Sequence, residues 1–192
     1  MKKLSLLALL MVLSLPLMIS AQEEAPKAEI FGGYSFLRVY PGEGIDSITG
    51  HGFSLSVAGN ITRSFGVVGE FSRYSKSNFL SDIINDPDLN QIDASVITYL
   101  FGPRFTVRTG KAEPFFHGLV GAARGSVDDP TVGGAESGSA FAYALGGGLD
   151  IKAHDNFAIR IAQLDYLQAR VDGEGVNSLR FSAGVVIRLG KR

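Results

Sequence analysis

The stretch NSLRFSAGVVIRLGKR, from Asn177 to Arg192, decides the fold class. Every second residue from Leu179 to Leu189 is apolar, and the residues between them include two arginines. Residues two apart in a β-strand share a face, so this stretch predicts a strand with one apolar face and one face that carries charge. A soluble barrel would turn the charged face to water, whereas a membrane barrel would turn the apolar face to lipid and enclose the arginines.

The composition narrows the class of protein. A length of 192 residues predicts one domain. The 18 Lys and Arg residues are balanced by 19 Asp and Glu residues, which argues against a nucleic-acid partner, because such proteins carry a clustered basic excess. The 24 glycines and the absence of cysteine favour a β-rich protein over a small secreted fold held by disulfides.

Residues 1–21 predict a cleaved signal peptide. Lys2 and Lys3 provide the positive start, residues 4–17 form the apolar segment, and small residues precede a cleavage site after Ala21. A permanent membrane anchor is the alternative, but the apolar run is short for a membrane span and has a proline near its end. We therefore expect the chain to be exported.

The chain beyond the signal peptide repeats alternating segments separated by turn residues. After a short lead at residues 22–27, residues 28–190 form one expected barrel domain with eight such segments, the even number typical of outer-membrane barrels. The segments are 28–39, 51–60, 65–74, 95–108, 113–126, 139–151, 156–171 and 177–192.

Two of these segments do not alternate cleanly. In the seventh, Gln163 and Asp165 are out of phase with Arg160, and a β-bulge near Ala162 would bring them back to one face. The phase of the fifth segment stays open at this point.

The connections between segments alternate in length. Three are short and polar, at residues 59–64, 109–113 and 152–156, whereas the longer ones include loops 40–50, 75–92 and 127–138. Such alternation places the short turns at one end and the long loops at the other, as in outer-membrane barrels. The three longer loops are the places where we expect an external partner to bind, if there is one.

The two faces of the segments distinguish a membrane barrel from a soluble one. The bulky apolar faces carry almost no charge, and a charge that faces the bilayer midplane costs about 2–4 kcal/mol. The opposite faces combine small residues with charged ones, which suits the narrow interior of an eight-stranded barrel. We predict a lumen charge network of Glu70, Arg104, Asp150, Arg160, Arg180 and Arg188.

Pairing within this network determines whether the barrel conducts. Buried single charges are costly, so we expect Asp150 to pair with Arg160 and Glu70 to pair with Arg104. A paired network would plug the barrel and leave little conductance. Singly hydrated charges in a water-filled lumen are the alternative.

The chain resembles the small OmpA/OmpX-like outer-membrane barrels, which are also described as porin-family barrels. The resemblance covers the signal peptide and the barrel domain. Its most specific part is the set Ser182, Gly184, Ile187 and Leu189, which fits the family's assembly signal of a polar residue, a glycine and two hydrophobic residues one position apart. The chain ends Gly-Lys-Arg, whereas many such proteins end on an aromatic residue.

This resemblance implies an all-β fold, an eight-stranded antiparallel up-and-down transmembrane β-barrel. It further implies a monomer in the bacterial outer membrane, in contact with lipid and assembled by the barrel-insertion machinery. No cofactor is implied.

We expect no enzymatic activity. The histidines are His51, His117 and His154, and only His51 has a nearby serine, Ser54, with nothing to orient the pair for nucleophilic catalysis. We therefore expect these histidines to serve no chemistry.

Metal binding is equally unsupported by the motifs. Asp82, Asp86, Asp88 and Asp93 do not have the spacing of a calcium-binding EF-hand loop, and Asp-Pro-Asp is ordinary turn sequence. The function expected from the sequence is thus a structural or interaction role for a plugged membrane barrel. Two alternatives remain, a narrow passive pore for small solutes and a soluble periplasmic ligand-binding barrel.

Overall fold

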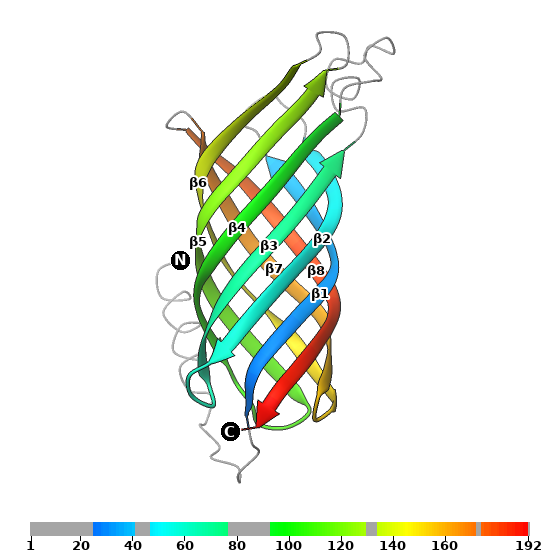
Figure 1. Ribbon diagram of the computed structural model, residues 1–192, viewed down its shortest axis with the longest axis vertical. Coiled ribbons are helices and arrows are strands. Elements are labelled where there is room, and N and C mark those ends of the chain that lie inside the picture. The colour runs from blue at the N-terminus through cyan, green and yellow to red at the C-terminus, as the bar shows by residue number, and fades with distance from the viewer. Residues whose placement is uncertain (1–24, 41–46, 77–92, 130–133, 172–173, 192) are drawn as a thin grey trace, which may run out of the picture.

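The computed structural model describes residues 25–40, 47–76, 93–129, 134–171 and 174–191. These residues form a closed antiparallel barrel in which each strand pairs with its neighbours in the chain and the last strand pairs with the first (Figure 1). The strands are β1 (Pro26–Tyr40), β2 (Ile48–Asn60), β3 (Phe65–Lys76), β4 (Asp93–Thr106), β5 (Ala112–Asp129), β6 (Gly134–His154), β7 (Phe157–Val171) and β8 (Glu174–Lys191).

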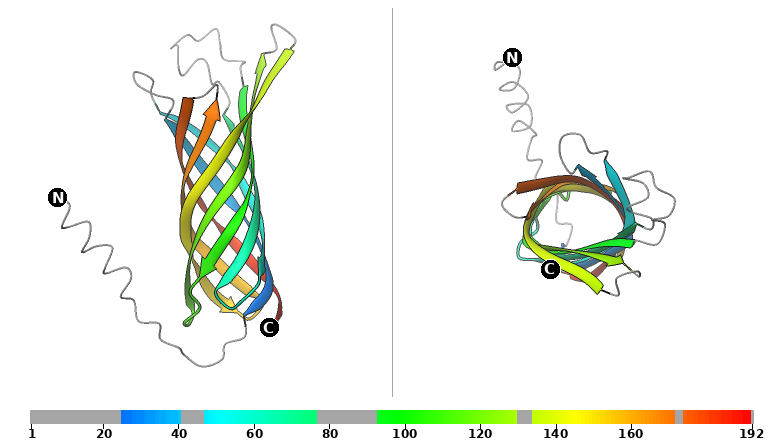
Figure 2. Two further views of the ribbon diagram at one scale, coloured as in Figure 1. Left: turned by 90° about the vertical axis from the view of Figure 1, so that its left-hand side faces the viewer. Right: turned by 90° about the horizontal axis from the view of Figure 1, so that it is seen from above.

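The eight-stranded up-and-down topology confirms the predicted fold class. The end-on view shows the strands as one ring (Figure 2). The short connections β2–β3, β4–β5 and β6–β7 share one end of the barrel, here called the turn end, and the opposite end is called the loop end. No helix in the described part of the chain has the length and hydropathy needed to cross a membrane.

The alternation of side chains fixes which face each residue takes. Phe101 on β4 is 62% exposed on the outer surface, whereas its neighbour Leu100 is 3% exposed and points into the lumen. The same alternation holds along β2, β3, β6 and β8, so the predicted faces of these strands are confirmed. On these strands the outer surface is apolar and the inner surface holds the charges, which is the arrangement expected of a membrane barrel.

A β-bulge in β7 is confirmed. The register between β7 and β8 shifts between Arg160 and Gln163, which leaves one extra residue in β7 at this point. The bulge returns Gln163 and Asp165 to the lumen, where both are fully buried.

The phase of β5, which the sequence left open, is now settled. Glu113, Phe115, His117 and Leu119 all point into the lumen and are buried. Phe116, which lies between Phe115 and His117, is on the outer surface and is 62% exposed.

The expected loop at residues 127–138 is wrong. β5 runs to Asp129 and β6 begins at Gly134, and the pairs Asp128↔Ala135 and Asp129↔Gly134 continue the ladder. Ladder hydrogen bonds join backbone groups, so polar and glycine-rich residues extend a hairpin without alternating apolar side chains. The β5–β6 hairpin consequently projects beyond the other strands at the loop end (Figure 2).

The barrel is also longer at the turn end than expected. β1 begins at Pro26, inside the stretch assigned to the lead, and pairs there with Lys191 on β8. Loops 40–50 and 75–92 fall largely outside the described residues.

Candidate functional site

The lumen is the candidate functional site, because the buried charges of the barrel meet there. An eight-stranded barrel has an interior only wide enough for side chains. The lumen holds these buried ionisable residues: Glu29, Glu70, Arg104, Arg108, Glu113, His117, Asp150, Arg160, Asp165, Arg180 and Arg188. All six residues of the predicted charge network are among them.

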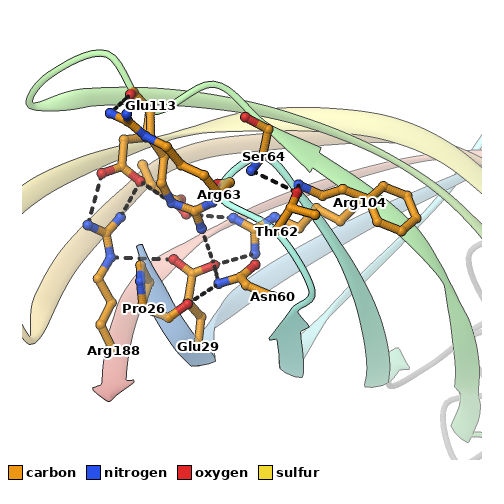
Figure 3. Close-up of polar contacts among 12 residues, drawn as sticks. Pro26, Glu29, Asn60, Thr62, Arg63, Ser64, Arg104, Glu113 and Arg188 are labelled. Carbon is orange, nitrogen blue, oxygen red and sulfur yellow. Dashed lines mark hydrogen bonds and ion pairs between the residues drawn. The ribbon is translucent and has the colours of Figure 1, made fainter. Parts of the chain in front are cut away.

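The layer nearest the turn end is centred on Glu29 of β1 (Figure 3). Its carboxylate lies 3.5 Å from Arg104, 3.0 Å from Arg108 and 3.4 Å from Arg188. Arg188 of β8 donates two further hydrogen bonds, of 3.0 and 2.7 Å, to Glu113 of β5. The pairs of Glu29 with Arg104 and of Arg188 with Glu113 join strands that are not neighbours and so cross the interior.

The next layer is built on Asp150 of β6. Arg160 on the neighbouring strand β7 donates hydrogen bonds of 2.8 and 3.1 Å to this carboxylate, so the expected contact between the two residues is present. Arg104 on β4, two strands away from β6, donates a third, of 3.1 Å. Two arginines therefore share one carboxylate, and Arg104 also reaches the layer of Glu29.

Aromatic rings cover the faces of the guanidinium groups in this layer. The Arg160 guanidinium carbon lies 4.3 Å from the ring centroids of both Phe31 and Phe115. Arg104 lies 4.2 Å from the Phe115 centroid. A planar guanidinium donates in its plane and stacks on its faces, so the rings cover its faces while the carboxylates accept hydrogen bonds in its plane.

A third layer, nearer the loop end, is centred on Arg180 of β8. This arginine donates hydrogen bonds of 2.9 and 2.7 Å to Asp165 of β7 and makes a short ion pair with Glu70 of β3. His117 of β5 contacts the other oxygen of Asp165 at 2.6 Å. Gln163 accepts a hydrogen bond from Arg160 and donates one to Asp165, which links this layer to the one below.

The expected pairing of Glu70 with Arg104 is wrong. The register places Glu70 opposite Leu100 and Arg104 opposite Gly66, so the two charges lie at different depths. Glu70 instead reaches across the lumen to Arg180. Strand adjacency was therefore not enough to predict the partner of Glu70, because contacts across the lumen depend on the register around the whole barrel.

Sequence reasoning missed several members of the network. Glu29 and Glu113 are the only carboxylates in their strands that face the lumen among the described side chains, and the phase of β5 had been left open. Asp165 and Gln163 could have been included, since the expected bulge already placed them on the same face as Arg160. The missed residues are Glu29, Arg108, Glu113, His117, Gln163 and Asp165.

The lumen becomes apolar towards the loop end. Hydroxyl groups lie above the charges, with Ser35 bonded to Tyr74 at 3.0 Å and to Ser182 at 2.7 Å. Beyond them lies a cavity of about 370 Å³. Its lining includes Leu37, Val39, Val96, Ala123, Leu167, Ala169 and Val176. We had expected a lumen of small and charged residues throughout. The structure instead places the charges towards the turn end and apolar side chains towards the loop end.

The candidate catalytic pair is not assembled. His51 is exposed on the outer surface, where it contacts Tyr34 and Phe36. Ser54 is fully buried in the lumen and accepts a hydrogen bond from Ser72. The two side chains lie on opposite faces of β2 and cannot act on one substrate.

The candidate calcium ligands fall mostly outside the structure. Asp82, Asp86 and Asp88 lie outside the described residues, and only the backbone of Asp93 is described. Within the described side chains, no group of three or more His, Asp or Glu residues has the arrangement of a metal site.

The four residues of the assembly signal divide between the two faces of β8. Ser182 points into the lumen, whereas Ile187 and Leu189 face outward, 48% and 46% exposed. Gly184 pairs with Gly33 of β1 where the barrel closes, and a Cβ atom on Gly184 would lie 2.3 Å from the carbonyl oxygen of Gly32. Gly184 is therefore needed for the close approach of β8 and β1 in the folded barrel.

Comparison with known proteins places the chain among membrane barrels. A family model described as outer membrane protein beta-barrel domain matches residues 5–188. Ail, the attachment invasion locus protein of Yersinia pestis, is similar with 25% identity over 85% of this chain and 99% of its own, at a TM-score of 0.58. The structure of Ail in complex with the heparin analogue sucrose octasulfate matches with 26% identity, the same coverage and the same TM-score.

Neisserial surface protein A is similar in fold alone. It matches with 14% identity over 88% of this chain and 100% of its own, at a TM-score of 0.68. No curated protein matches the chain.

Proposed function

This chain belongs to the outer membrane protein beta-barrel domain family, and from that premise we propose that it is a plugged, non-conducting barrel with a structural or interaction role. This membership agrees with the resemblance to the small OmpA/OmpX-like barrels. The soluble periplasmic alternative is dropped, because the family is one of membrane proteins.

One observation carries the proposal: buried ion pairs cross the lumen and join strands that are not neighbours. Glu70 on β3 pairs with Arg180 on β8, and Glu29 on β1 pairs with Arg104 on β4. We infer that water and ions pass only if such pairs separate, which would leave buried charges uncompensated. The linked layers would have to open together, so the closed state dominates.

The proposal assigns no chemistry to the barrel. His51 and Ser54 lie on opposite faces of β2, and the charged lumen residues are occupied by one another. The role is therefore a non-enzymatic one, with no cofactor. Similarity to Ail, whose name is that of an attachment protein, supports an interaction role more than a purely mechanical one.

Contact with an external partner would be made at the loop end. Among the described strands, β5 and β6 project furthest there, and loops 40–50 and 75–92 connect strands at the same end. We propose that the mature chain, freed of residues 1–21, reaches the outer membrane as a monomer with this end outside. Insertion by the barrel-insertion machinery through the signal in β8 is part of the same proposal.

Efflux of a small solute from liposomes tests the closed state. Wild-type protein should release trapped solute no faster than protein-free liposomes. Glu70→Ala and Asp150→Ala should increase the rate, because each removes one carboxylate from the network. Glu70→Ala leaves Arg180 with Asp165 alone, and Asp150→Ala leaves Arg160 without its carboxylate. Asp155→Ala is the matched control, since this carboxylate lies exposed in the β6–β7 turn. Rapid efflux through wild type would instead favour the narrow pore.

A further inference from the structure

A groove lies on the outer surface of the barrel, where β1, β2, β3 and β4 are neighbours. Its volume is about 490 Å³. The outward side chains that line it are Ile30, Leu55, Val57, Phe71, Tyr99 and Phe101. These side chains are apolar apart from one tyrosine hydroxyl, so the groove differs in chemistry from the charged lumen.

The floor of the groove is Gly69, which has no side chain to fill it. The register pairs Ile30 with Val57, Val57 with Gly69 and Gly69 with Phe101, so these four residues form one row across four strands. A Cβ atom built on Gly69 would meet no other atom within 4 Å. A glycine inside a strand gives up packing and often marks a place where another molecule approaches closely.

Aromatic rings form the side of the groove that is nearer the loop end. Phe71 lies in the next row, and its ring centroid is 5.9 Å from that of Phe53 and 5.3 Å from that of Tyr99. Movement of the Phe71 ring into the groove would break both of these contacts. The groove is therefore held open by its own neighbours.

The depth of the groove places it deep in the apolar band. Gly69 lies four residues after Phe65, the first residue of β3 at the turn end. At roughly 3.3 Å per residue and a tilt of about 40°, it lies about 10 Å inside the band, whose full height is ~25 Å. Among the described side chains, neither this row nor the row on either side of it carries a charge.

These surroundings decide what can occupy the groove. Water would need two to four polar partners, and one tyrosine hydroxyl does not provide them. An empty groove would deprive its walls of van der Waals contacts. The groove is continuous with the surface that faces lipid in this family of membrane barrels, and at this depth the lipid presents hydrocarbon.

We propose that the groove over Gly69 binds one acyl chain of a phospholipid and recognises the hydrocarbon rather than the headgroup. A chain in the groove contacts a floor and two sides, whereas a chain on the rest of the outer surface contacts one side. It should consequently stay longer at this place than elsewhere around the barrel. This inference rests on the membrane placement proposed above.

Photochemical labelling of the reconstituted protein tests the groove. The probe is phosphatidylcholine with a diazirine near the end of one acyl chain, and mass spectrometry of peptides locates the label. Leu55, Val57, Phe71 and Phe101 should together carry at least five times the label per residue of Ile161. Ile161 is the reference because it is also exposed and also lies four residues after the start of its strand, β7.

A matched pair of variants locates the effect. Gly69→Leu fills the groove and should lower its label to the level of Ile161. Gly59→Leu adds the same side chain to the outer surface, one row nearer the turn end, and its Cβ atom also meets nothing within 4 Å. Its label should stay within twofold of wild type, and equal loss in the two variants would overturn the groove.

Wild-type protein alone also decides the question, whether or not the variants fold. Equal label on the groove and on Ile161 would overturn the proposal. Phosphatidylglycerol with the same diazirine should label the same residues, and label from one headgroup only would overturn recognition of the chain. Cross-links between two protein copies through the groove would make a second copy the occupant. Insertion is scored separately by gel mobility without heating, and failure of wild type to insert would contradict the proposed function instead.

Discussion

Arg180 of β8 and Asp165 of β7 are joined by two hydrogen bonds, of 2.9 and 2.7 Å, and neither side chain has any exposure to solvent. The same guanidinium pairs with Glu70 across the lumen. One arginine therefore neutralises two buried carboxylates on different strands, β7 and β3.

Arg180→Ala should lower the free energy of unfolding by about 3–5 kcal/mol, because it leaves Asp165 and Glu70 buried without their shared arginine. The measurement is urea unfolding followed by gel mobility without heating. Lys191→Ala is the control, since its ion pair with Asp155 is more than half exposed and worth at most about 1 kcal/mol. Equal losses in the two variants would show that the lumen pairs are hydrated rather than buried.

The outward residues of β8 allow the assembly signal to be tested apart from the folded state. Ile187→Ala with Leu189→Ala should slow insertion by the cellular machinery at least tenfold. Leu55→Ala with Val57→Ala, which removes similar side chains from the outer surface of β2, should not. Both double variants should fold alike when purified protein is diluted into detergent. If the two pairs were inserted at the same rate, the match of β8 to the signal would be accidental.

Gly184→Ala should behave differently from the outward pair. A Cβ atom there meets the backbone of Gly32 and Gly33, so the closure between β1 and β8 is disturbed in the barrel itself. Folding into detergent and insertion in cells should fail together. Normal folding in detergent with failed insertion in cells would mean that the glycine is read only by the machinery.

The mature protein should begin at Gln22. Lys2 and Lys3 would then be absent from the membrane-inserted chain. Edman sequencing or intact-mass measurement of protein extracted from the outer membrane checks this. Recovery of a chain that still begins at Met1 would contradict export by a cleaved signal.

The fold could be predicted from the sequence because lipid excludes charge from the outward face of a membrane barrel along the middle of each strand. Alternation therefore identifies the two faces even in short segments. The sequence did not predict the ends of β5 and β6 at the loop end. Where both faces of a strand meet water, apolar and polar residues no longer alternate. Asp128 and Asp129 consequently read as a loop although they continue the hairpin.

The sequence predicted some members of the lumen network, but of the two expected ion pairs only Asp150 with Arg160 is present. Arg160 and Asp150 were expected to meet because they lie on adjacent strands at similar depth. Glu70 and Arg180 meet across the lumen, and their contact depends on the tilt and register of all the strands between them. A single sequence gives the register of one hairpin at a time, so contacts across the barrel have to come from the structure.

The most direct test of the account is the electrical conductance of the reconstituted barrel in a planar bilayer. Wild type should show only small or rare openings, and Glu70→Ala or Asp150→Ala should raise the conductance or the fraction of time open. Asp155→Ala should match wild type, which separates loss of a lumen carboxylate from loss of any carboxylate. Large, steady wild-type currents that neither lumen variant changes would contradict the plugged barrel and establish an open pore.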